Sequence, residues 1–464
     1  MAALTFPRRV TSTSSTITVD SGGLPAWIPN AGEFASVSLS NGSVIDPNVI
    51  DPLYAGTDLW RGSSGGWSTV WASGYGGGIY APTLGTYGSL LLCNGGHNTW
   101  WGNGVVRYDI ADRVWSHHTY PIYAANQHSI VGGVVTDTDS LDSDSVNDRV
   151  GLAGHYIKYA DGTPIAGAEV TGNSTTNWQP VPLHTNCGIS FIPQDAGGGT
   201  LGSLVFLGHD QTGLRVLSAN GRVFRLDLET NIWTAIPYAF NQSSSVPGCE
   251  YDSLNKVLWI FTANSGVKAH SYLIGTTRTL STSAGLNMSA DYCNACFMAS
   301  RSLLIMATRN NSGTSPVIRA FNVAGYVHGT TTTIPSYTLN IAAWPTGWPP
   351  SLHKGNLGGK DKLEYCEQDG NVYYLNTASG TNTTCTLYKL QPPAVGQEQA
   401  GTWTWVPETI NLMSGDTFGS FVGTNPSEEP TWGGKTRFVP SLKSLFVTAK
   451  HNTPVQAIRS INWT

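Results

Sequence analysis

Charge is scarce in this chain of 464 residues, because Asp, Glu, Lys and Arg together make up 12% of it. Soluble proteins on average carry about 25% of these residues. Helices depend on charged surface positions and avoid glycine, of which this chain has 53. A formal net charge of −5 supplies no basic field for nucleic acid. The balance predicts a turn-rich, all-β protein that does not recognise nucleic acid.

Long apolar runs are also lacking, and the cysteines are few and mostly far apart. No window approaches about 18 consecutive apolar residues, so we expect no membrane anchor. The start, MAALTFPRRV, has no apolar segment after its arginines, so we expect no secretory signal. Seven widely spread cysteines favour buried free thiols in a reducing compartment. The one close pair, Cys293-x-x-Cys296, is a weak zinc signal because no second pair lies beside it.

What the chain does contain is an internal repeat. VVRYDIADRVW at 105–115 returns as VFRLDLETNIW at 223–233, and Trp178 marks a copy between them. Gly-His pairs that begin at 96, 154 and 208 give a similar period. Further along, three segments are each typical of a strand, a tight turn and an apolar strand: 249–264, 296–310 and 437–452. A fixed period of this kind predicts a repeat architecture.

These units resemble the kelch repeat of β-propellers, in which a diglycine follows the second strand and an aromatic pair comes from the third and fourth. Gly95-Gly96, Tyr108 and Trp115 match that motif in full, and other units keep parts of it. The resemblance implies an all-β, kelch-like β-propeller of seven blades with four antiparallel strands each, and six blades is the alternative. The expected blades are 65–121, 122–182, 183–240, 241–287, 288–346, 347–411 and 412–464.

The ends of the chain indicate how such a ring would close. The last unit ends in VQAIRSINWT, which is typical of a third strand with no fourth after it. LPAWIPNAG around Trp27 resembles the fourth-strand pattern TWVP. A ring leaves no free sheet edge, so we expect residues 11–30 to supply the missing strand. Residues 1–64 would then be the closing segment, and 65–464 the propeller.

Several residues are candidates for a site. His128, His184 and His353 hold similar early places in their blades and could converge on the mouth of the channel, where histidines can bind a metal. Propeller symmetry stacks equivalent residues whether or not they bind anything, so we assign no metal and no cofactor. The stretch Asp137–Asp148 holds five aspartates and is either a calcium loop or a solvated hairpin tip.

The tryptophans divide into two groups. Trp100 and Trp101 lie in the loop sequence HNTWWGNG, where exposed rings would contact a sugar or a protein partner. Four others recur at equivalent blade positions and are expected to pack between blades: Trp115, Trp178, Trp233 and Trp405.

The kelch resemblance also brings in galactose oxidase, a copper-radical enzyme that needs two histidines, two tyrosines and a cysteine joined to one tyrosine. Tyr365 and Cys366 are adjacent in the chain, as are Tyr292 and Cys293, and neighbouring strand residues point to opposite faces. No segment reproduces the ligand pattern of that family. We therefore assign no catalytic residue and expect no enzyme activity.

Two hypotheses for function follow. A composition poor in charge and rich in Ser, Thr, Asn and Gly resembles the nozzle or hub proteins of bacteriophage tails, which fold in the bacterial cytoplasm and assemble as rings. This favours a non-enzymatic virion protein that forms a homo-oligomeric ring and contacts other tail proteins through loops and insertions near 136–148 and 376–401. The alternative is a carbohydrate-binding or carbohydrate-oxidising kelch-type propeller.

Overall fold

Strands and tight turns make up nearly all of the regular structure in the computed structural model of the chain. The described residues are 23–38, 77–93, 105–119, 128–131, 134–137, 188–207, 222–237, 248–262, 266–283, 288–310, 316–344, 363–376, 383–416, 436–448 and 454–463. Three single-turn 3-10 helices occur among them: η5 (Gln194–Ala196), η6 (Ala299–Arg301) and η8 (Pro440–Leu442). No helix in these ranges is long and apolar enough to cross a membrane.

Four sheets each contain four antiparallel strands taken in chain order. The first contains β2 (Gly77–Ala81), β3 (Ser89–Cys93), β4 (Val105–Asp109) and β5 (Val114–Thr119). The second contains β8 (Ile189–Ile192), β9 (Ser203–Leu207), β10 (Arg222–Asp227) and β11 (Trp233–Pro237). The third contains β12 (Gly248–Asp252), β13 (Val257–Thr262), β14 (Gly266–Ser271) and β15 (Thr276–Thr282), with β19 (Thr333–Ile334) added in parallel. The fourth contains β16 (Met288–Met298), β17 (Leu303–Asn310), β18 (Pro316–Asn322) and β20 (Ser336–Thr338).

A nine-stranded sheet joins two further four-stranded units. One unit is β22 (Glu364–Cys366), β23 (Asn371–Asn376), β24 (Thr384–Gln391) and β25 (Thr402–Leu412), with β21 (Asn340–Ile341) beside β25. The other is β26 (Thr436–Val439), β27 (Ser444–Val447), β28 (Gln456–Ile458) and β1 (Glu33–Ser36). A separate hairpin is formed by β6 (His128–Val131) and β7 (Val134–Asp137).

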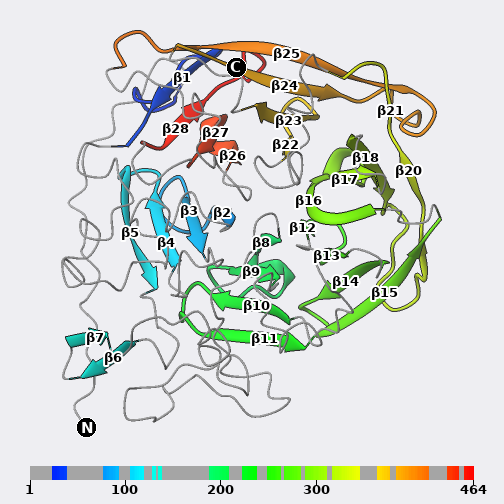
Figure 1. Cartoon of the computed structure of the whole chain (residues 1–464), viewed down its shortest axis with the longest axis horizontal. Coiled ribbons are helices and arrows are strands. Elements are labelled where there is room, and N and C mark those ends of the chain that lie inside the picture. The colour runs from blue at the N-terminus through cyan, green and yellow to red at the C-terminus, as the bar shows by residue number, and fades with distance from the viewer. Residues whose placement is uncertain are drawn as a thin grey trace.

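The four-stranded units are arranged radially, with the first strand of each at the centre and the last at the rim (Figure 1). The first strands contact one another in a closed cycle, in the order β2, β8, β12, β16, β22, β26 and back to β2. The fold is therefore a β-propeller, and the all-β prediction is confirmed. Seven blades and the kelch type are not confirmed. The second blade was expected at 122–182. Within that range the structure describes the β6–β7 hairpin, which lies apart from the inner strands (Figure 1).

Each sheet buries both of its faces against its neighbours, which is the physical reason for the ring. Six clusters of buried side chains lie one between each pair of adjacent four-stranded units in the described residues. Trp115, Trp233 and Trp405 belong to these clusters, as predicted. The five cysteines with described side chains are free and buried, which confirms that prediction for them.

The repeated Arg and Asp of the sequence motif form a turn-and-brace unit. In the first copy, Arg107 Nε donates to Ser89 Oγ at 2.8 Å, which ties β4 to β3. Asp109 Oδ1 accepts the backbone N–H groups of Ala111 and Asp112 at 3.0 and 3.1 Å. An aspartate that caps a turn in this way fixes where the fourth strand begins.

The second copy repeats these contacts. Arg225 Nε donates to Ser203 Oγ at 2.8 Å, and Asp227 Oδ1 accepts N–H groups from Glu229 and Thr230, both at 3.0 Å. The sequence repeat is therefore explained by local hydrogen bonding that recurs in each copy.

A third part of this unit was missed by the sequence analysis. GTYGS at 85–89 and GTLGS at 199–203 supply the serine of each brace and a glycine of positive φ beside the aspartate. A Cβ on Gly85 would lie 2.7 Å from Asp109 Oδ2, so any larger residue would displace the turn.

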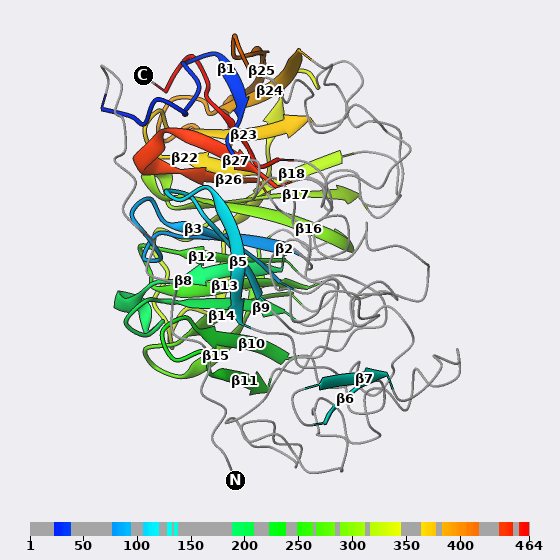
Figure 2. The same cartoon turned by 90° about the vertical axis from the view of Figure 1, so that its left-hand side faces the viewer.

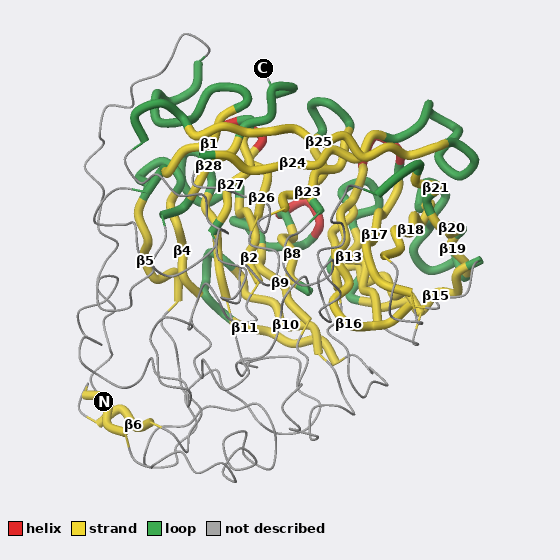
Figure 3. Tube along the Cα trace, turned by 45° about the horizontal axis from the view of Figure 1, so that its top comes forward, coloured by secondary structure: helices red, strands yellow, loops and turns green. Residues whose placement is uncertain are grey.

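The connections of each unit fall on two faces of the ring. In an antiparallel sheet, the turn from first to second strand and the turn from third to fourth strand lie at the same end. These turns belong to the described residues, and we call this end the turn face; several of them line the left-hand side of Figure 2 and appear as green loops in Figure 3. The connections from second to third strand begin and end at the opposite face, and most of their residues lie outside the described ranges.

The closing strand lies at 33–36 and not within 11–30. β1 pairs antiparallel with β28 through Phe34 and Ile458, and it pairs in parallel with β25 through Glu33 and Asn411. Residues 23–30 contain no strand, and 1–22 lie outside the described residues. The segment around Trp27 comes just before β1 in the chain and is not itself a strand. Trp27 packs instead against the core cluster between the C-terminal unit and the β2–β5 unit.

The expected insertion at 376–401 contains a strand of the propeller. Residues 384–391 form β24, which pairs with β23 and β25, and 392–401 connect β24 to β25 on the turn face. The buried side chains Cys385 and Leu387 alternate with partly exposed ones, which is the pattern of a strand.

Arg437 joins three units at the point where the ring closes. Its Nη1 lies 3.0 Å from Glu364 Oε1 of β22, and its Nη2 donates to the carbonyl oxygen of Gly78 in β2. The Arg437 side chain is 6% exposed and that of Glu364 is 14% exposed, so water screens this ion pair little.

We expect Arg437→Met to lower the free energy of unfolding by about 3–5 kcal/mol, because it leaves Glu364 as a buried, unpaired charge. Lys256→Met is the control, since Lys256 also links two units but pairs with Asp195 at an exposed position. That change should cost at most about 1 kcal/mol. Urea unfolding measures both, and equal losses would contradict a special role for Arg437.

Removal of residues 1–38 should expose the edge of β28 and the side of β25 that β1 covers. Unpaired edges promote association, so we expect this chain to aggregate and to melt at a lower temperature. A chain that lacks only 1–22 keeps β1 and should melt like the full chain. Light scattering and calorimetry distinguish the two, and a monomeric, equally stable 1–38 deletion would refute closure by β1.

Candidate functional site

Most side chains singled out in the sequence lie outside the described residues. This applies to Trp100, Trp101, His184 and His353, and to the aspartate-rich stretch beyond Asp137. His128 opens β6, whose backbone pairs with β7, while its side chain is outside the description. The metal, calcium and partner predictions for these residues stay predictions.

Metal ligation and thiol chemistry find no support in the described part of the chain. No three His, Cys, Asp or Glu side chains there lie close enough to hold an ion. Burial raises the pKa of the Cys93 and Cys385 thiols well above their usual range, so both stay protonated and unreactive at neutral pH. Tyr365 and Cys366 pack into different core clusters on opposite faces of β22, as predicted for adjacent strand residues.

A pocket of about 340 Å³ opens on the turn face between the β16–β20 unit and the β22–β25 unit. We call it the junction pocket. Three segments contribute to it: the η6 turn, the β22–β23 turn and the segment after β24. Its lining residues are Ser300, Arg301, Asp369, Gly370, Asn371, Gln391, Pro392 and Val395.

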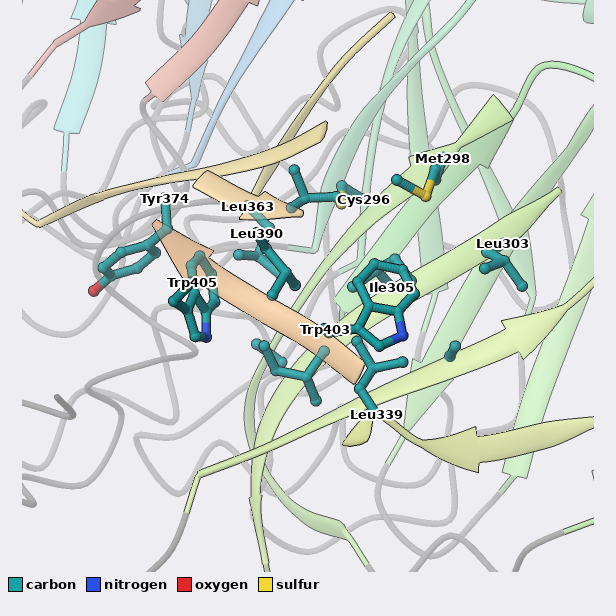
Figure 4. Close-up of a cluster of buried hydrophobic side chains, with 14 of the residues drawn as sticks. Cys296, Met298, Leu303, Ile305, Leu339, Leu363, Tyr374, Leu390, Trp403 and Trp405 are labelled. Atoms are coloured by element: carbon teal, nitrogen blue, oxygen red, sulfur yellow. The ribbon is translucent and has the colours of Figure 1, made fainter. Parts of the chain in front are cut away.

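The junction that carries the pocket has a core of large side chains from both units. Trp403 and Trp405 of β25 pack with Met298, Leu303 and Ile305 of the facing sheet (Figure 4). Trp403 is fully buried, and its Nε1 donates to the backbone carbonyl of Glu398 at 2.9 Å. Trp403 thus ties the loop 392–401 to the core of this junction.

An ion pair fixes one wall of the pocket. Arg301 Nη1 lies 2.7 Å from Glu398 Oε1, and the two side chains are 12% and 16% exposed. The same carboxylate oxygen accepts the N–H of Gly396 at 3.0 Å. Burial favours the neutral acid, but these hydrogen bonds and the charge of Arg301 outweigh it and lower the pKa of Glu398. Arg301 is therefore held in one orientation with its charge neutralised.

Hydrogen bonds also orient other residues of the pocket lining. Tyr365 OH donates to Ser300 Oγ at 2.8 Å, so the Ser300 hydroxyl hydrogen is left to donate elsewhere. Asp369 accepts the N–H of Asn371 at 3.2 Å and the hydroxyl of Tyr373. Asn371 Nδ2 donates to the Asp369 carbonyl at 3.0 Å. The pocket thus presents fixed hydrogen-bonding groups, while its described lining holds no His, Cys or Lys that would act as a base or nucleophile.

A second group of titratable side chains lies between the β8–β11 and β12–β15 units. The rings of His270 and Tyr272 meet edge-on with centroids 4.5 Å apart, and Arg225 lies over the Tyr272 ring at 5.3 Å. His270 Nδ1 is 2.8 Å from Thr277 Oγ1. Burial, aided by the charges of His328 and Arg225, lowers the pKa of His270 to about 4. Burial raises the pKa of Tyr272, so both rings are neutral at pH 7 and serve packing.

No family model and no curated protein matches this chain. Among solved structures, an auxiliary nutrient binding protein from Bacteroides ovatus aligns at 9% identity and a TM-score of 0.41, over 86% of this chain and 75% of that one. The WD40 domain of Toxoplasma gondii coronin aligns at 7% identity and 0.34, over 93% and 88%. The PQQ domain of pyranose dehydrogenase from Coprinopsis cinerea aligns at 9% and 0.32, over 66% and 87%. Likenesses this remote assign no function.

The buried histidine predicts a pH dependence of stability. Between pH 6.5, the ordinary pKa of histidine, and about 4, the unfolded chain binds a proton at His270 that the folded chain does not. Stability should therefore fall as the pH is lowered through this window. His270→Gln keeps a polar group beside Thr277 but cannot titrate, so its stability should fall less steeply. Urea unfolding from pH 7 to 4 that is equally steep in the two chains would contradict this.

Proposed function

We propose that this propeller is a non-enzymatic structural component of a virion, of the bacteriophage tail nozzle or hub type, which acts by assembling with further copies of itself into a ring and with other tail proteins. The support is geometric and compositional. The geometric part is a set of exposed aliphatic side chains at the tips of turns, and the compositional part is the low content of charge.

Large aliphatic side chains stand at turn tips in five of the six four-stranded units in the described residues. Turn tips are ordinarily occupied by Gly, Asn, Asp, Ser and Pro. Each of these side chains is more than half exposed, so none serves the core of this chain: Ile232, Leu254, Leu273, Ile274, Val327, Val395 and Ile461. Exposed apolar side chains grouped on one rim are typical of a surface that meets another protein.

Some of the charges described on this face are paired within the chain. Lys256 pairs with Asp195 at 2.5 Å, and Arg301 pairs with Glu398. A face whose charges already have partners gives up less solvation energy when it is covered. The low proportion of charged residues in the whole sequence supports the same conclusion. These properties favour permanent assembly in a virion over transient charged recognition.

The Leu273–Ile274 tip gives the sharpest test. It is held in a tight turn in which Gly275 N–H donates to the Ser271 carbonyl at 2.8 Å, and the two side chains are 58% and 61% exposed. We expect the purified chain to sediment as a discrete oligomer. The double change Leu273→Ser and Ile274→Ser should shift it to monomer with an unchanged melting temperature, because no core contact is lost.

Glu229→Ser is the matched control, since Glu229 is an exposed polar tip of a neighbouring turn, and it should sediment like the unchanged chain. Sedimentation velocity over a range of concentrations measures the oligomeric state of the unchanged chain, the double variant and the control. A chain that stays monomeric throughout, or turnover of a sugar or primary alcohol by the purified protein, would overturn the proposal.

A further inference from the structure

We propose that the junction pocket binds one neutral saccharide unit. The lining of the site does not include the Leu273–Ile274 tip, and it shares one exposed turn residue, Val395, with the aliphatic tips described above. It combines fixed polar groups, a single cation that is paired within the protein, and one apolar side within a single cavity.

The polar groups of the pocket are of mixed kind. Ser300 and Arg301 offer donors, Asp369 offers acceptor oxygens, and the amide of Gln391 offers both. A sugar hydroxyl both donates and accepts, so neighbouring hydroxyls on a ring can use donors and acceptors that lie side by side. A ligand with acceptors alone or donors alone would leave half of these groups without a partner, at a cost in binding free energy.

The charges of the pocket limit the class of ligand further. The cation of Arg301 is matched by Glu398 at 2.7 Å, and the side chain of Asp369 accepts hydrogen bonds from Asn371 and Tyr373. An anionic ligand would meet Asp369, which disfavours it. A neutral ligand meets no such penalty.

The remaining side of the pocket is apolar. Pro392 and Val395 belong to the loop 392–401, and Val395 is 79% exposed. The C–H face of a sugar ring can cover such side chains while its hydroxyls turn to the polar wall. A volume of about 340 Å³ lies at the small end of the range of about 300–1,000 Å³ for ligand pockets, which suits a single sugar unit better than a chain of them.

The pocket is preorganised for this ligand. Arg301 is held by Glu398, Ser300 by Tyr365, and Asn371 by the Asp369 carbonyl. Groups already fixed in the free protein lose little conformational freedom on binding.

The test uses the full chain and saturation-transfer NMR with methyl α-D-glucopyranoside and methyl α-D-galactopyranoside, with glucuronate and glucosamine as charged probes. We expect at least one neutral glycoside to bind and glucuronate to bind more weakly; tighter binding of glucosamine than of both glycosides would contradict a neutral ligand. Gln391→Ala removes an amide from the pocket, and Val395→Ser removes apolar surface at an exposed position. Each should weaken binding at least about fivefold, the effect of roughly one lost contact.

Gln397→Ala is the matched control, because Gln397 is exposed in the same loop but does not line the pocket, and it should bind like the unchanged chain. Absence of binding by both glycosides, equal binding of glucuronate, or full binding by Gln391→Ala would each overturn the proposal. Leu273 and Ile274 do not line the pocket, so the changes that test assembly leave the pocket residues intact. The saccharide site and the assembly role can therefore fail separately.

Discussion

Closure of the ring is the constraint on which the rest of this structure depends. Every four-stranded unit buries both faces, so each is stable only when it has a neighbour on either side. The C-terminal unit has three consecutive strands of its own, and β1 supplies the fourth by pairing with β28. Arg437 stabilises the same closure near the centre of the ring, because it binds Glu364 of one neighbouring unit and Gly78 of the other. Without both contacts, the two ends of the chain would leave an open edge.

Much of the fold could be predicted from residues that make local contacts. The Arg-x-Asp repeat predicted equivalent strands because its hydrogen bonds lie within one hairpin, as the Arg107–Ser89 and Arg225–Ser203 pairs show. The hairpins at 249–264, 296–310 and 437–452 were predicted correctly for the same reason. The GTYGS and GTLGS segments carried an equally local signal, and a search for glycine spacing before each apolar strand would have found them.

Long-range pairing was harder to predict. β1 has only four residues, and its place is set by strands more than 370 residues away, so the Trp27 pattern led to a strand placed too early. The number of units around the ring is likewise a property of how the inner strands meet, and spacing along the chain does not determine it. The junction pocket could not have been predicted at all, because Arg301, Asp369 and Gln391 come from two units that the sequence does not link.

The turn face carries both the aliphatic tips and the junction pocket, and the loop 392–401 belongs to each. Val395 is exposed on this loop because Glu398 is turned inward to Arg301 and Trp403 holds the Glu398 carbonyl. One ion pair therefore shapes the pocket wall and also presents an apolar side chain beside it. A protein partner that covers Val395 would also cover the entrance to the pocket. Assembly through this unit and ligand binding in the junction pocket would then compete for the same loop, whereas assembly through the Leu273–Ile274 tip, two units around the ring, would leave the pocket open.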